Sequence, residues 1–187
     1  MVFLDFGKIY VMIEVDKFMP NRNNLDKFTI EENHHYSKGC HIKLHSGLTR
    51  LSNEVIFTDS CLYQFDDVDQ LDTNKLFGLS YGLHHNNSIR FGWRADNNKI
   101  KLSLYCYNDS KRSMIDICNV DINNIIKLNF EYDSKKLQIV AIVEVKDATY
   151  MVTHPFKMPK FKLGYHLWPY FGGNKTAPHE IHIWLKH

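Results

Sequence analysis

Short runs of alternating apolar and polar residues, separated by turn residues, recur along most of this 187-residue chain. In the clearest run, residues 99–107 (KIKLSLYCY), every second side chain from Ile100 to Cys106 is apolar. Successive side chains of a β-strand point to opposite faces, so this pattern is typical of a strand with one buried face. No sustained helical periodicity competes with it, and we therefore expect an all-β protein.

Two pairs of runs lie close enough together to form hairpins. Residues 88–94 (SIRFGWR) and 99–107 are joined by a tight connection, and residues 125–132 (IIKLNFEY) and 136–145 (KLQIVAIVEV) flank a short DSK stretch. The last of these runs is apolar on both faces over LQIVAIV, which predicts a central strand covered on both sides.

Further strands are expected at residues 39–45, 54–59, 62–65, 75–82, 150–156 and 179–185. Together these make roughly ten strands, enough for two packed sheets. Single helical turns are expected within residues 65–74 and 120–126. The predicted fold is an all-β, antiparallel two-sheet jelly-roll sandwich, formed as a single domain over residues 1–187.

Composition argues against several functional classes. Lys and Arg total 23 and Asp and Glu 21, a net charge of +2, and this balance does not indicate a nucleic-acid partner. No apolar run approaches the ~20 residues that span a membrane, so no membrane partner is expected. The apolar N-terminus is interrupted by Asp5, Lys8 and Glu14 and is not a secretory signal. The compartment is then cytoplasmic, or a leader has been removed, and the oligomeric state stays open.

The four cysteines, Cys40, Cys61, Cys106 and Cys118, are widely spaced and form no C-x-x-C pair. This spacing argues against a zinc knuckle, and buried free thiols are the expectation. A disulfide between Cys106 and Cys118 is the alternative, and it requires their two strands to be neighbours.

Two stretches are similar to a known group of proteins. Residues 74–94 carry Lys75, Leu76, Gly78, Leu79, Gly82, Ser88, Arg90, Trp93 and Arg94, and residues 170–183 carry Phe171, Gly172, Gly173, Ala177 and Pro178 before the last strand. Both stretches resemble concanavalin A-like jelly-roll proteins of the alginate- and glucuronan-lyase-like group, which also has uncharacterised bacterial members. The resemblance implies a concanavalin A-like fold and polyuronate cleavage with Tyr or His as base and acid. No catalytic motif of that group can be matched residue by residue here.

The polar face of the first hairpin is the leading candidate for a binding site. Arg90 and Arg94 would project on the same side as Lys101, Ser103, Tyr105 and Tyr107. Arginine can hold a carboxylate with two parallel hydrogen bonds, and tyrosine offers a flat ring with a hydroxyl that suits sugars. Aromatic residues near the C-terminus would add a rim. The predicted ligand-binding residues are Arg90, Arg94, Tyr105, Tyr107, Trp168, Tyr170 and Trp184. A solvated face with Arg–Tyr stacking is the alternative.

Three functions follow from these residues. The first is lectin-like binding of a polysaccharide or oligosaccharide, with the arginines favouring an acidic one. The second is a polysaccharide lyase that cleaves a polyuronate by β-elimination, with Tyr105, Tyr107, His84 and His85 as candidate acid–base residues. The third is a structural or assembly protein without glycan activity. The chain has no G-x-S-x-G nucleophile elbow and no glycine-rich phosphate loop.

Metal ligation has little support in the sequence. The pairs His34-His35 and His84-His85 point to opposite faces if they lie on strands, and His179 and His182 are poorly spaced for one ion. No metal site and no cofactor are expected. A structural calcium at Asp66, Asp67, Asp69 and Asp72 stays open, although the cluster lacks the glycine and the terminal glutamate of a helix–loop–helix calcium loop.

Overall fold

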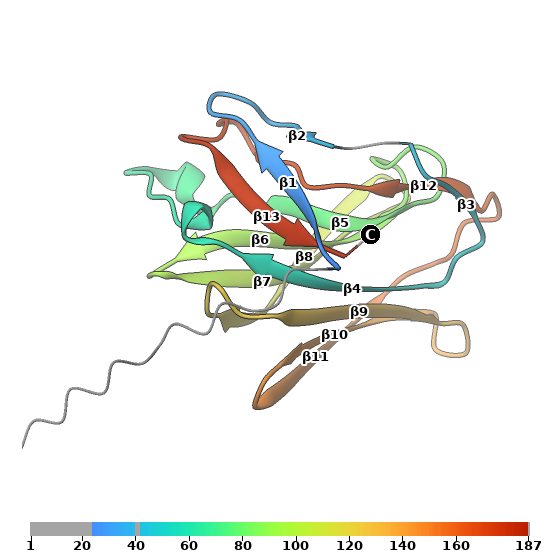
Figure 1. Cartoon of the computed structure of the whole chain (residues 1–187). Coiled ribbons are helices and arrows are strands. Elements are labelled where there is room, and N and C mark those ends of the chain that lie inside the picture. The colour runs from blue at the N-terminus through green and yellow to red at the C-terminus, as the bar shows by residue number, and fades with distance from the viewer. Residues whose placement is uncertain (1–23, 40–41, 187) are drawn as a thin grey trace, which may run out of the picture.

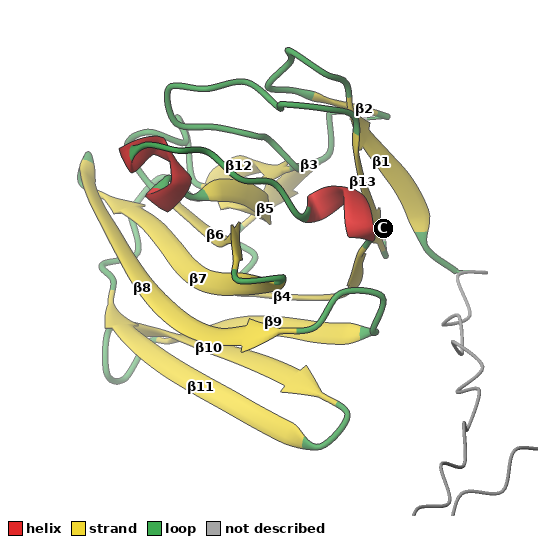
Figure 2. Ribbon diagram, turned by 90° about the vertical axis from the view of Figure 1, so that its left-hand side faces the viewer, coloured by secondary structure: helices red, strands yellow, loops and turns green. Residues whose placement is uncertain are grey.

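The computed structural model describes residues 24–39 and 42–186, and within these residues the regular secondary structure is β-strand apart from two short 3-10 turns. Two antiparallel sheets lie against each other (Figure 1 and Figure 2). The predicted all-β, two-sheet jelly-roll sandwich is confirmed. Figure 1 also shows β13 (red) beside β1 (blue), so segments from opposite ends of the chain pair within one sheet.

The larger sheet has seven strands in the order β11-β10-β9-β4-β13-β1-β2. Its members are β1 (Asp26–Ile30), β2 (Ser37–Lys38), β4 (Arg50–Phe57), β9 (Ile126–Asp133), β10 (Gln138–Val145), β11 (Ala148–Pro155) and β13 (Ile181–Leu185).

The smaller sheet has six strands in the order β3-β12-β5-β6-β7-β8. Its members are β3 (Leu44–Ser46), β5 (Asn74–Ser80), β6 (Ser88–Asp96), β7 (Lys99–Asn108), β8 (Lys111–Val120) and β12 (Leu163–Leu167). Two 3-10 turns, η1 (Asp59–Cys61) and η2 (Val68–Leu71), connect β4 to β5.

The inner faces of the two sheets form one continuous apolar core. Ile100, Leu102, Leu104 and Cys106 of β7 are almost fully buried there, as the alternation in the sequence predicts. Burial of apolar area at about 25 cal/mol per Å² makes this core the main stabilising term of the sandwich. Because inward positions are used by the core, the alternate side chains of each strand are left to build the outer faces.

Both predicted hairpins are confirmed, as β6–β7 and β9–β10. Strand β10 is paired on both sides, with β9 and β11. The expectation that both of its faces are covered is wrong: Ile139, Ala141 and Val143 are fully buried, whereas Val140 and Ile142 are only half-buried. The seven-stranded sheet packs against its partner sheet with one face, so an apolar residue on the other face keeps some contact with solvent.

Some local predictions are wrong. Residues 62–65 form a loop, because the Leu62 N–H donates to Asp59 O and the Phe65 N–H donates to Gln70 Oε1 instead of a strand partner. Residues 120–126 contain a turn with Asn123 at φ 58°, not a helical turn, whereas the turn expected within residues 65–74 is present as η2. The strand expected at residues 39–45 is too long: it begins only at Leu44, Gly39 is in a turn, Ile42 and Lys43 are irregular, and residues 40–41 lie outside the described residues.

Cys61, Cys106 and Cys118 are free thiols. Strands β7 and β8 are neighbours, but Cys106 lies opposite Ser113 and Cys118 opposite Leu102, so the disulfide considered above does not form. Burial raises the pKa of the Cys61 and Cys106 thiols to about 12, which keeps them protonated and unreactive. Cys40 and the apolar N-terminal stretch lie outside the described residues. No helix in the described part of the chain is long and apolar enough to cross a membrane.

Candidate functional site

A cleft of about 740 Å³ lies on the outer face of the six-stranded sheet. The sheet supplies its floor, and the segments before β6 and after β12 supply side chains beside it. The lining residues are Tyr36, Ile42, Lys75, His84, His85, Arg90, Tyr105, Tyr107, Arg112, Tyr165, His166, Leu167, Trp168, Pro169, Tyr170, Gly173 and Asn174. A cleft of this size is typical of small-molecule and oligosaccharide sites rather than of packing defects.

Strand register brings the floor residues together. Gly78 of β5 lies opposite Arg90 of β6, which lies opposite Tyr105 of β7. A Cβ atom at Gly78 would come within 2.4 Å of the Arg90 Cβ and 2.1 Å of the Ile89 carbonyl oxygen. Only glycine therefore lets β5 and β6 approach this closely at Arg90.

Arg90 is the most unusual group in the cleft. Its side chain is charged but only 7% exposed, and its Nε has no hydrogen-bond partner. Burial lowers the pKa of its guanidinium, and the neighbours that favour its charge are the hydroxyls of four tyrosines rather than a carboxylate. Buried cations in proteins are normally paired with an anion. No described carboxylate neighbours Arg90.

Two more cationic side chains line the same cleft. Lys75 Nζ donates to Gly172 O at 2.7 Å and lies 5.3 Å and 5.7 Å from the ring centroids of Tyr105 and Tyr170. Arg112 extends from β8 opposite Tyr107. No Asp or Glu is among the described residues that line the cleft, so its field attracts anions.

One wall is the segment that follows β12, residues 168–174. Its backbone pairs with β5, since the Lys75 N–H donates to Tyr170 O at 2.8 Å and the Tyr170 N–H donates to Lys75 O at 2.9 Å. The buried Asn74 side chain accepts the Gly172 N–H and donates to the Tyr63 hydroxyl. These bonds fix the position of the aromatic rings of this wall relative to the floor.

The opposite wall is the loop before β6, residues 81–87, which carries His84 and His85. The Ser88 hydroxyl donates to His84 O at 2.7 Å, and His84 Nδ1 lies 2.6 Å from the Tyr165 hydroxyl of β12. Burial, then the charge of Arg90, lowers the pKa of His84 to about 4. His84 is therefore neutral at pH 7 and is a weaker base than an ordinary histidine.

The structure brings most of the predicted site residues into one cleft. Arg90, Tyr105, Tyr107, Trp168 and Tyr170 all line it, together with the candidate acid–base residues His84 and His85.

Two predicted ligand-binding residues lie elsewhere. Arg94 is outside the lining and holds Asp116 with two hydrogen bonds of 3.0 and 2.7 Å, so its charge is already neutralised. Trp184 is on β13 of the other sheet, between Lys27 and Ile56 in the register. Trp184 alternates with the buried Ile183 and Leu185, and strand order places it on a sheet that does not line the cleft.

Sequence reasoning missed three polar residues of the site as binding groups: Lys75, Arg112 and Tyr165. Lys75 drew notice only through the family resemblance, and Tyr165 only as one aromatic among several. Nothing local in residues 111–120 indicated that β8 would lie beside β7. Only that pairing places Arg112 opposite Tyr107.

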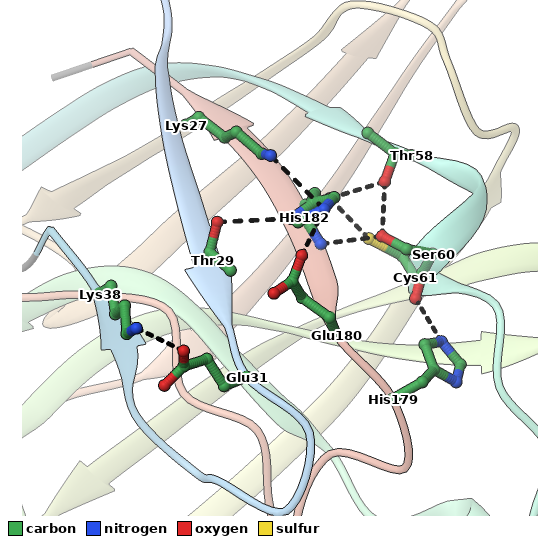
Figure 3. A network of polar contacts seen from close by, with 10 residues as sticks. All are labelled: Lys27, Thr29, Glu31, Lys38, Thr58, Ser60, Cys61, His179, Glu180 and His182. Atoms are coloured by element: carbon green, nitrogen blue, oxygen red, sulfur yellow. Dashed lines mark hydrogen bonds and ion pairs between the residues drawn. The ribbon is translucent and has the colours of Figure 1, made fainter.

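His182 of β13 and His179, which lies just before this strand, are part of a different network, shown in Figure 3. His182 Nε2 lies 3.0 Å from Glu180 Oε1 and its Nδ1 lies 3.3 Å from Thr29 Oγ1, while His179 Nε2 donates to Ser60 O at 2.9 Å. These bonds tie β13 to β1 and η1. In the described residues no three His, Cys, Asp or Glu side chains come together as a metal site requires.

The acidic cluster around η2 is linked to the wall segment. Lys175 pairs with Asp67 and lies 3.8 Å from Asp69, and the Asn174 N–H donates to Asp72 Oδ2 at 3.3 Å. Lysine thus supplies the positive charge in this cluster.

No protein-family model and no curated protein matches this chain. Among solved structures, a functionally unknown protein from Saccharomyces cerevisiae is similar, with 8% identity, a TM-score of 0.49 and coverage of 88% of this chain and 89% of that one. Winged bean acidic lectin, solved with methyl-α-D-galactose, is similar with 8% identity, a TM-score of 0.45 and coverage of 86% and 97%. A carbohydrate-binding module from Bacillus subtilis has 8% identity, a TM-score of 0.43 and coverage of 85% and 83%. The likeness concerns the architecture alone.

Proposed function

We propose that this protein binds an acidic glycan in the cleft of the six-stranded sheet. The observation that carries the proposal is Arg90, a charged side chain buried at the floor for which the described residues supply no anionic partner. A carboxylate of the ligand would supply that partner, because a guanidinium and a carboxylate match in shape and charge.

The remainder of the cleft suits a sugar. Tyr107, Trp168 and Tyr170 are partly exposed aromatic side chains of the cleft that can contact a pyranose, and hydroxyl groups of the sugar can bond the tyrosine hydroxyls. Lys75 and Arg112 add positive charge on either side of Arg90. The arrangement favours a uronate-type sugar over a neutral one, since a neutral ligand would leave the guanidinium unpaired.

Binding to a panel of oligouronates and their neutral counterparts tests the proposal. We expect Arg90→Met to abolish binding, and Arg94→Met, on the same strand and face, to leave it intact. Trp168→Ala should weaken binding, and Trp184→Ala on the other sheet should not. Equal binding of acidic and neutral sugars, or retention of binding in Arg90→Met, would contradict the proposal.

One specific contact favours a second candidate, the polysaccharide lyase. The Tyr165 hydroxyl, 2.6 Å from the neutral His84 and in the same cleft as Arg90, has the arrangement that acid–base catalysis requires. In β-elimination a base removes the C5 proton of the uronate and a C4=C5 double bond forms. The C4–O bond breaks, and the leaving oxygen takes a proton from an acid. Arg90 would neutralise the carboxylate and stabilise the carbanion that develops beside it.

Ultraviolet absorbance of the unsaturated uronate product separates the two candidates. A lyase would produce rising absorbance that Tyr165→Phe removes while binding persists. Binding without any absorbance change supports a lectin-like protein. If neither binding nor an absorbance change is observed, the structural or assembly role is the remaining candidate.

A further inference from the structure

We propose that Lys75 is a second anion contact of the cleft, and that its protonation regulates how tightly the cleft holds an acidic ligand. The inference rests on the proposed function for the nature of the ligand. It adds a direct contact between Lys75 and the anion and a dependence of affinity on pH, neither of which the proposed function requires.

The position of Lys75 is fixed by its surroundings. Its backbone is paired with Tyr170 on one side, and the strand register shifts between Lys75 and Gly78, where β5 is irregular. Its amine donates to Gly172 O and lies over the rings of Tyr105 and Tyr170. These contacts hold the amine inside the cleft instead of letting it extend into solvent, as surface lysines do.

The charged and aromatic groups that face Lys75 come from five segments of the chain. Arg90 from β6 and Arg112 from β8 oppose its positive charge, Asp72 from the segment before β5 favours it, and Tyr105 and Tyr170 present ring faces. Burial, then the charge of Arg90, lowers the pKa of Lys75 to about 8. Lys75 therefore loses its proton within the range over which most proteins stay folded, unlike an ordinary lysine near 10.4.

An anion bound in the cleft raises the pKa of the Lys75 amine again. A carboxylate or sulfate beside Arg90 stabilises the ammonium form of Lys75, so the complex holds the proton more tightly than the free protein does. Ligand binding then takes up a proton above the pKa of the free protein. Affinity is expected to fall by up to about tenfold for each pH unit between the free and bound pKa values. His84, with a pKa near 4, does not titrate in this interval.

The first measurement needs no glycan. The lysine amines are dimethylated with carbon-labelled methyl groups, and the NMR signals of these methyl groups report the protonation of each amine during a pH titration. The Lys75 signal is assigned by its absence in Lys75→Arg. We expect the Lys75 signal to titrate near pH 8, well below the ordinary lysine value of about 10.4. If Lys75 titrates near that ordinary value, the inference is wrong.

The second measurement is calorimetric binding of inorganic sulfate, whose charge is constant, and of an oligouronate, at about pH 7 and about pH 9. The wild type should lose affinity at the higher pH and should take up protons, seen as a dependence of the binding heat on the buffer. Lys75→Arg should bind equally at both pH values, and Lys75→Met weakly at both. A pH dependence that persists in Lys75→Arg overturns the inference, and Lys75→Arg retains a cation even if Lys75→Met fails to fold.

The outcomes separate this inference from the proposed function. Sulfate binding with the expected pH dependence, but without oligouronate binding, supports the role of Lys75 and contradicts the proposed glycan ligand. Oligouronate binding that is independent of pH supports the glycan ligand and contradicts the role of Lys75. If neither anion binds, both proposals are wrong.

Discussion

Replacement of Arg90 by methionine should make the ligand-free protein more stable while it destroys anion binding. The side chain is 7% exposed, and its Nε is buried without a hydrogen-bond partner. Folding therefore removes a charge from water without returning an equivalent interaction. Methionine is unbranched and apolar, so it can follow the path of the arginine stem between Gly78 and Tyr105 and keep most of its packing.

The magnitude follows from the same contacts. An unsatisfied buried polar group costs about 1–3 kcal/mol, and apolar replacement of buried ionic groups has stabilised proteins by about 1–4 kcal/mol. We expect the free energy of unfolding to rise by about 1–3 kcal/mol in Arg90→Met. For a chain of this length, each kcal/mol corresponds to roughly 2–4 °C in Tm.

Thermal and urea unfolding in a buffer of weakly binding anions measure the effect. Saturating ligand should stabilise the wild type, by about 2.7 kcal/mol at a hundredfold excess over Kd, and should not stabilise Arg90→Met. Arg94→Met is the matched control. It breaks the half-exposed pair with Asp116 and should lower stability by about 0.2–1 kcal/mol. If Arg90→Met is less stable than the wild type by more than the control, Arg90 supports the fold and the reasoning is refuted.

Three further substitutions test how the cleft is built. Gly78→Ala should destabilise the protein by about 1–3 kcal/mol or more in urea unfolding, because its Cβ would collide with β6, and wild-type stability would show that the strands separate at no cost. Asn74→Ala should cost about 1–3 kcal/mol and weaken ligand binding, since the Gly172 N–H loses its acceptor; unchanged binding would mean that the wall is held by other contacts. Tyr165→Phe should cost no more than about 1.5 kcal/mol, and a larger loss of Tm would assign Tyr165 a structural role.

Local patterns in the sequence were sufficient for most of the strands and for the two-sheet sandwich, but they did not predict β1 or β12. The alternation in residues 99–107 predicts both the strand and its buried face. Side chains of a strand alternate between its two faces, so the apolar set must face the core and the other set the outer face. It also predicts that Arg90, Tyr105 and Tyr107 share a face once the hairpin register is known. Residues 62–65 show the limit of such patterns. The Phe65 N–H donates to the Gln70 side chain, so it needs no partner strand.

The sequence by itself thus determined the class of fold, the first hairpin and the face on which its arginines and tyrosines lie. Only the tertiary structure decided which of those residues form a site. Arg90 and Arg94 are equivalent in the strand pattern, yet Asp116 of β8 neutralises one and nothing in the described chain neutralises the other. Lys75, Tyr165 and Trp168 join Arg90, and Trp184 does not, because strand order is set by long-range pairing that minimises exposed apolar surface. No short stretch of sequence contains that information.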